Sequence, residues 1–127
     1  MFEDPAGPIE DFEWGRFVIR GKVHAEDGQG VGKDIFLLGD AVYPWEERVG
    51  HTLQPEMVAC IQEKGVQVLV IGNGVNGRIR VPKRTRKRIR KYGVEILIVE
   101  KTPAACEIYN QFYRAGEAVA LLAHGTC

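Results

Sequence analysis

The fold of this chain is decided by residues 66–100, VQVLVIGNGVNGRIRVPKRTRKRIRKYGVEILIVE, in which two apolar runs flank a glycine-rich turn and a basic segment. Val66–Ile71 and Val94–Val99 have the apolar composition of strands that are buried on both faces. Between them, residues 82–92 start with a proline and are followed by Gly93, which is typical of a helix. A strand, a helix and a second strand in this order indicate a parallel crossover unit.

The flanking sequence extends this pattern in both directions. Pro55–Lys64 predicts a helix with Gly65 in position to end it, and Thr102 predicts the cap of a further helix that ends at Gly116. A last strand is predicted at Ala118–Leu122. In the first part of the chain we predict one or two strands within Phe12–Val23, a turn at Glu26–Lys33, a buried strand at Asp34–Leu38 and a loop at Gly39–Pro44.

These elements predict an α/β fold in a single domain, residues 9–127. We expect three layers, with helices packed on a central mixed sheet that is mostly parallel, and an antiparallel strand element at the N-terminus. At 127 residues the chain is long enough to form one hydrophobic core without disulfides or metals. Residues 1–8 hold two prolines, a glycine and two acids, and we expect them to form a flexible acidic tail.

Cysteine usage and hydropathy limit the class of protein. The three cysteines (Cys60, Cys106 and Cys127) lack the paired spacing of zinc ligands, and an odd number does not close a disulfide framework. No apolar run approaches the roughly 18 residues that cross a bilayer. The first fifteen residues carry acids but no basic residue, unlike a signal or transit peptide. We therefore expect a cytoplasmic protein with no cofactor, no metal ion and no membrane insertion.

Charge is concentrated in one segment although the net charge is zero. Residues 1–77 carry thirteen acidic and six basic side chains, whereas residues 78–91 carry nine basic and no acidic ones. Like charges four residues apart destabilise a helix, so another interaction of these side chains should offset the loss of stability. The alternatives to a simply solvated face are acids of the same molecule, an acidic protein partner, and nucleic acid or anionic lipid. The basic residues are Arg78, Arg80, Lys83, Arg84, Arg86, Lys87, Arg88, Arg90 and Lys91.

The turn after the first strand matches the G-x-G-x-x-G spacing of a dinucleotide-binding loop through Gly72, Gly74 and Gly77. Glu100 stands where such a fold places the acid that binds ribose. However, the pyrophosphate should lie at the N-terminus of a helix that starts within the loop. Pro82 would fall in the second turn of that helix, at a cost of about 3 kcal/mol. We interpret the glycines as a turn out of the sheet, and binding of a nucleotide, another anionic ligand or nucleic acid through this loop and the basic segment is the alternative function.

Few residues are placed for catalysis. Cys106 lies in the first turn of the third predicted helix, where the helix dipole would lower the pKa of a thiol. His51 and His124 are candidate bases, but the sequence does not indicate that either contacts this thiol, and we interpret Cys106 as a small buried residue. The chain has no P-loop, nucleophile elbow or metal-binding cluster, so we expect no enzymatic activity.

Four segments resemble one small α/β family, whose members include an assembly factor of mitochondrial respiratory complex I and an adipogenesis-associated cytoplasmic protein. The segments are Asp34–Trp45 (DIFLLGDAVYPW), His51–Leu53 (HTL), Val68–Gly74 (VLVIGNG) and Thr102–Asn110 (TPAACEIYN). The resemblance covers nearly the whole chain. It implies a three-layer α/β domain with no established enzyme activity, which acts through protein contacts.

We therefore predict a non-enzymatic binding or assembly-factor-like domain with a protein partner. Sites in parallel α/β sheets gather at the carboxyl ends of strands, so Gly72–Gly77 and Glu100–Cys106 are expected to line a shallow pocket together. The residues singled out for ligand or partner binding are Trp45, Gly72, Asn73, Gly74, Thr102, Cys106, Tyr109 and Asn110. The predicted basic patch consists of Arg78, Arg80, Lys83, Arg84, Lys87, Arg88 and Lys91.

Overall fold

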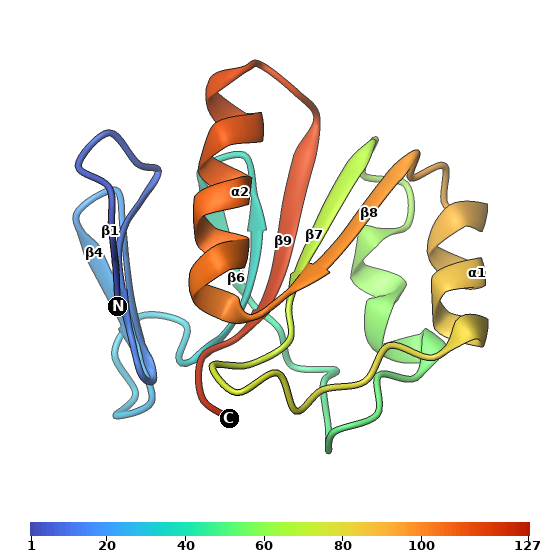
Figure 1. Ribbon diagram of the computed structural model, residues 1–127, viewed down its shortest axis with the longest axis horizontal. Coiled ribbons are helices and arrows are strands. Elements are labelled where there is room, and N and C mark those ends of the chain that lie inside the picture. Colours follow the sequence, from blue (N-terminus) through green and yellow to red (C-terminus); the bar gives the residue numbers. More distant parts are fainter.

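The computed structural model describes residues 1–127 and contains two β-sheets and three helices (Figure 1). The N-terminal sheet has the strand order β1-β2-β3-β4 and is antiparallel throughout. It contains four strands, whereas the sequence predicted one or two within Phe12–Val23, because glycines with positive φ turn the chain at Gly15 and Gly21. Its strands are β1 (Phe2–Glu3), β2 (Ile9–Glu13), β3 (Arg16–Ile19) and β4 (Lys22–Ala25).

The central sheet has the order β6-β5-β9-β7-β8. β7 pairs in parallel with β8 and β9, whereas β5 pairs antiparallel with β6 and β9. The predicted mixed sheet is therefore confirmed, but parallel and antiparallel pairings are equally frequent, and the sheet is not mostly parallel. The strands are β5 (Asp34–Leu38), β6 (Ala41–Pro44), β7 (Val68–Gly72), β8 (Ile96–Glu100) and β9 (Val119–His124).

Alternate residues of the central strands enter two separate hydrophobic cores. Val68 and Val70 of β7 face the helix α2 (Thr102–Arg114), whereas Leu69 and Ile71 face the other side. On that other side lie the 3₁₀ helix η1 (Pro55–Ile61) and the helix α1 (Lys83–Lys91). The period of two along each strand therefore produces a sheet that is covered on both faces.

Helix α2 lies between the two sheets and joins them (Figure 1). Its buried residues pack against Phe12 and Phe17 of the N-terminal sheet and against the central strands. The fully buried Asn110 adds polar contacts: its Oδ1 accepts a hydrogen bond from the Ile9 N–H (3.1 Å), and its Nδ2 donates to the Ile9 carbonyl (2.8 Å) and to Asp4 (3.1 Å). Asn110 therefore fixes the N-terminal sheet against the helix.

Three segments differ from the sequence prediction. Gly39–Pro44, predicted as a loop, contains strand β6, because a two-residue turn with Gly39 at φ +63° folds it back on β5. The predicted helix Pro55–Lys64 is a 3₁₀ helix that ends at Ile61, because Gln62 is extended. Residues 1–8, predicted as a tail, contain strand β1, and Asp4 forms an ion pair with Arg114 at 2.6 Å.

The longest helix, α2, has 13 residues, and none of the helices combines the length and the apolarity that a membrane span requires.

We expect the substitution Asn110→Ala to lower the free energy of unfolding by about 2–3 kcal/mol, because it leaves the buried N–H and C=O of Ile9 without a partner. Urea unfolding followed by circular dichroism measures this difference. The matched control is Gln111→Ala at the next, exposed position, which should change stability by no more than about 0.5 kcal/mol. Equal stability of the two variants would show that Asn110 does not hold the sheets together.

Candidate functional site

The loops that follow β7 and β8 leave the sheet at the same edge, because the two strands are parallel and Gly72 is aligned with Glu100. The Asn73 N–H donates to the Glu100 carbonyl (2.9 Å), and the Thr102 N–H donates to the Gly74 carbonyl (3.1 Å). The two loops therefore lie together as expected. They are bonded directly to each other, however, and neither loop lines any of the five cavities of the structure.

Thr102 links three elements at this edge. The sequence predicted that it caps α2, but it does not. It is the first residue of the helix, after Lys101 at the cap position. Its hydroxyl accepts a hydrogen bond from the Gly74 N–H (3.0 Å) and donates one to the His124 carbonyl (2.7 Å). Because Thr102 is fully buried, these bonds fix the glycine-rich loop, the start of α2 and the end of β9 relative to one another.

Gly74 allows the segment that follows β9 to pass close to the glycine-rich loop. Its φ is +106°, and a side chain at this position would collide with the backbone carbonyl of Cys127. The neighbouring N–H groups hold the same segment: Val75 donates to the Thr126 carbonyl (2.7 Å) and Arg78 to the Cys127 carbonyl (3.3 Å). The second glycine of the G-x-G-x-x-G pattern therefore permits close approach of the protein's own backbone.

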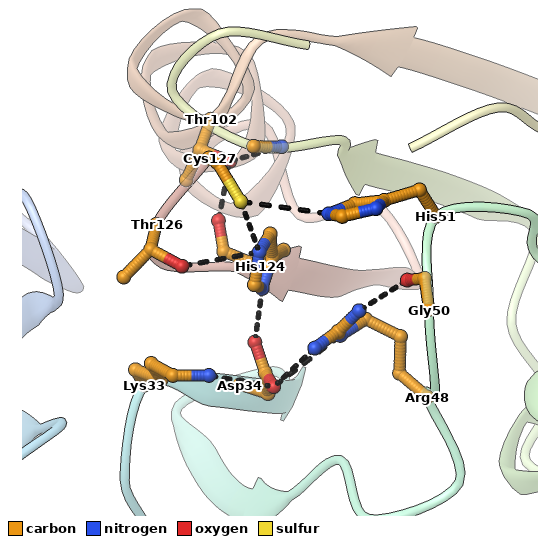
Figure 2. Close-up of polar contacts among 10 residues, drawn as sticks. Lys33, Asp34, Arg48, Gly50, His51, Thr102, His124, Thr126 and Cys127 are labelled. Atoms are coloured by element: carbon orange, nitrogen blue, oxygen red, sulfur yellow. Dashed lines mark hydrogen bonds and ion pairs between the residues drawn. The ribbon is translucent and has the colours of Figure 1, made fainter. Parts of the chain in front are cut away.

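His124 and Asp34 form the buried centre of the site. They are aligned on the antiparallel strands β9 and β5, and His124 Nδ1 lies 2.6 Å from Asp34 Oδ1 (Figure 2). A carboxylate only accepts hydrogen bonds, so the Nδ1–H of His124 donates to it, and in the neutral ring Nε2 is left as an acceptor. The other carboxylate oxygen accepts from Arg48 at 3.2 Å and pairs with Lys33 at 3.5 Å.

The Cys127 thiol lies between two imidazole rings (Figure 2). Its Sγ is 3.5 Å from Nε2 of His51 and 3.7 Å from Nε2 of His124, and the latter nitrogen also lies 3.1 Å from the Thr126 hydroxyl. His124 is buried, Cys127 is half-buried and His51 is exposed, so the thiol site extends from the interior of the protein to its surface. A thiol, an imidazole and a carboxylate in this order are the groups that cysteine nucleophiles use. We call Asp34, His51, His124 and Cys127 the thiol site.

The environment of Asp34 keeps its carboxyl group ionised. Burial raises the pKa, but the hydrogen bond from His124 and the charges of Arg48 and Lys33 lower it by more, so the pKa lies below its usual value. The Arg48 guanidinium also donates to the Gly50 carbonyl (2.6 Å) and in this way holds the loop that carries His51. The same carboxylate therefore orients both sides of the thiol site.

Cys106 is a small buried residue, as the sequence indicated, and the two candidate bases lie beside a different thiol. Cys106 is fully buried in α2, and burial raises its pKa instead of the helix dipole lowering it. His51 and His124, the two candidate bases, do flank a thiol, which is that of Cys127. The register that aligns Asp34 with His124 depends on which strands are neighbours, and no local sequence signal specifies it.

The remaining residues singled out from the sequence divide into two groups. Gly72, Asn73, Gly74 and Thr102 lie at the edge that supports the thiol site. Trp45 and Tyr109 are buried structural residues, as is Asn110 described above: the Trp45 Nε1–H donates to the Met57 carbonyl, and the Tyr109 hydroxyl donates to the Gly39 carbonyl. No group of three or more His, Cys, Asp or Glu side chains has the geometry of a metal site.

A second feature is the basic surface, which we define as the exposed cations of the predicted basic patch together with Arg90. None of them lies within 4.0 Å of a carboxylate, because all six ion pairs of the protein involve other cations. The alternative in which the molecule's own acids neutralise them therefore does not occur. Shallow grooves run between Lys83, Arg84, Lys87 and Arg90, and between Arg84, Lys87, Arg88 and Lys91.

Comparison with known proteins places this fold in a family without an assigned role. Residues 9–124 match the profile of a family described as protein of unknown function (DUF498/DUF598). The fold resembles a conserved hypothetical protein from Pyrococcus horikoshii, with a TM-score of 0.79, 19% identity and coverage of 94% of this chain and 98% of that one. It also resembles an outer membrane protein from Bartonella henselae, with a TM-score of 0.75, 22% identity and coverage of 94% and 95%. A protein from Rhodopseudomonas palustris matches with a TM-score of 0.62, 23% identity and coverage of 96% and 86%.

We expect Asp34→Asn to lower the free energy of unfolding by about 2–3 kcal/mol at pH 7, because Arg48 and His124 lose their charged partner. A carboxyl group whose folded-state pKa lies below the unfolded value stabilises the protein above that unfolded value, near 3.8, and loses the contribution as the pH falls through the folded-state pKa. The difference between wild type and variant should therefore stay constant from pH 7 to about 5 and shrink below about 4.

Urea unfolding across this pH range measures the difference, with Glu107→Gln as the control at an exposed acid outside every ion pair. A gap between wild type and Asp34→Asn that persists unchanged at pH 3 would contradict the assignment of the stabilisation to the ionised carboxylate.

Proposed function

The chain belongs to the family described as protein of unknown function (DUF498/DUF598), and from this premise we propose that it is a binding domain whose basic surface docks an acidic segment of a protein partner. The role is that of an assembly factor, which acts by contact and not by catalysis. The resemblance to a family that includes a respiratory complex I assembly factor supports this role.

The observation that carries the proposal is the absence of any ion pair on the basic surface. Helix α1 places Lys83, Lys87 and Lys91 four residues apart on one exposed stripe, and each like-charged pair costs a few tenths of a kcal/mol. These cations repel one another and have no acidic partner within the molecule. Binding of an external anion to them is therefore favourable. An acidic protein segment supplies carboxylates that pair with these cations.

The rest of the molecule favours a protein partner over nucleic acid. The first 77 residues carry more acidic than basic side chains, so a phosphate backbone that extended beyond α1 would be repelled. Recognition of single strands also uses exposed aromatic rings on which bases stack. The large exposed aromatic residues here are Trp14 and Tyr43, and neither belongs to the basic surface.

A cytoplasmic location for this interaction is part of the proposal. All three cysteines are free thiols, which is the state that a reducing compartment maintains.

We expect Lys87→Glu to weaken binding of an acidic peptide while it raises the free energy of unfolding. The substitution removes two like-charge pairs and creates two opposite-charge pairs, with Lys83 and Lys91, each worth about 0.2–0.5 kcal/mol. Loss of binding in a variant that is more stable than wild type cannot result from unfolding. Fluorescence anisotropy with a labelled poly-glutamate peptide of about twenty residues, at 50 and 200 mM salt, measures the affinity.

The control is Lys64→Glu, which has the same charge change at an exposed lysine outside the basic surface and outside every ion pair. It should bind as wild type does. A single-stranded oligonucleotide of matched charge is titrated in parallel. Tighter binding of the oligonucleotide than of the peptide would overturn the proposal in favour of nucleic acid, and binding of neither would identify the basic surface as a solvated face only.

A further inference from the structure

We propose that Cys127 is a nucleophilic thiol that forms a mixed disulfide with the disulfide of a small anionic thiol, and that His124 accepts its proton. This activity belongs to the thiol site and is independent of the docking role of helix α1. It rests on the contacts of four side chains that three separate parts of the chain bring together.

The acceptor of the thiol proton is Nε2 of His124. The Nδ1 of His124 is 2.6 Å from the Asp34 carboxylate, which only accepts hydrogen bonds, so the ring proton is on Nδ1 and Nε2 carries the lone pair. Thr126 Oγ1 and Cys127 Sγ are both within reach of this lone pair, at 3.1 and 3.7 Å. The tautomer that can take a proton from the thiol is therefore the one that Asp34 imposes.

Backbone hydrogen bonds fix the position of the sulfur. The carbonyls of Gly125, Thr126 and Cys127 accept hydrogen bonds from Gly15 (2.7 Å), Val75 (2.7 Å) and Arg78 (3.3 Å), respectively, so two separate loops hold the backbone that carries the thiol. His51 is held as well, because its carbonyl accepts from the Arg80 N–H at 2.8 Å. The sulfur is therefore fixed between the two rings and does not lie on a free segment.

The surroundings of Cys127 limit which molecules can react with its thiol. Cys127 lines none of the five cavities and is half-buried beside the exposed His51, so its reaction partner must approach from solvent. Arg78 and Arg80, whose N–H groups bind the backbone of Cys127 and His51, are exposed and have no carboxylate partner. Two exposed arginines that lack a carboxylate partner, and whose backbones are bonded to the residues of the thiol site, favour a reaction partner that carries carboxylates.

The reaction balances without a further reagent. The thiol proton moves to Nε2 of His124, and the sulfur electron pair attacks one sulfur of the disulfide R–S–S–R. A bond forms between Cys127 and that sulfur, the old S–S bond breaks, and the departing R–S⁻ takes the proton from His124 to become R–SH. The products are the mixed disulfide of Cys127 and one free small thiol.

The other two thiols are not equipped for this chemistry. Burial raises the pKa of Cys106, and burial together with the nearby Glu47 carboxylate raises the pKa of Cys60 to about 12. A single fast-reacting thiol per chain is therefore expected.

The test is the rate of reaction with 5,5′-dithiobis(2-nitrobenzoate), a dianionic disulfide, and with the neutral 4,4′-dithiodipyridine, followed by stopped-flow absorbance from pH 6 to 9. Mass spectrometry of the product should place the mixed disulfide on Cys127, and Cys127→Ser should abolish the fast phase while Cys60→Ser leaves it unchanged.

Two variants separate proton transfer from folding. His124→Gln should slow the reaction at pH 7 by about tenfold or more, because the thiol loses its proton acceptor. Because His124 is buried, His51→Gln at the exposed ring serves as the second variant, and it should slow the reaction with the fold intact. Unchanged rates and pH profiles in both variants, or a fast phase on Cys60, would overturn the proposal.

The class of partner is tested by the double variant Arg78→Gln/Arg80→Gln. It should slow the reaction with the anionic disulfide several-fold and leave the reaction with the neutral one unchanged. Equal effects on both reagents would overturn the assignment of an anionic partner.

Discussion

The central position of β9 is the constraint on which the rest of the structure depends. All six of its residues are buried, and it pairs antiparallel with β5 on one side and parallel with β7 on the other. The antiparallel register aligns His124 with Asp34, and the parallel register brings the end of β9 beside the glycine-rich loop that follows β7. One strand therefore joins the two halves of the chain and also assembles the thiol site.

Local sequence signals predict the second half of the chain well. Apolar runs, prolines at helix starts and glycines at helix ends act within a few residues, and they locate β7, α1, β8 and β9 to within about two residues. The hairpin of β5 and β6 was missed although a local signal exists, the glycine and aspartate of its two-residue turn.

The site could not be predicted in the same way. Asp34 and His124 are 90 residues apart, and only the order of strands in the sheet makes them neighbours. Thr102 and Gly74 were singled out from the resemblance, but their role depends on each other and on His124. The expectation of a pocket failed for a related reason, because the two loops fill the space between them with their own hydrogen bonds.

The edge position of β8 has a consequence for association between copies of the protein. β8 pairs only with β7, so its outer side offers unpaired N–H and C=O groups, and Ile96 is 45% exposed there. Helix α1 lies next to this edge (Figure 1), so two molecules that paired along β8 would also bring their cationic helices together. The resulting repulsion protects the open edge from self-association, and salt above about 0.1 M weakens that protection.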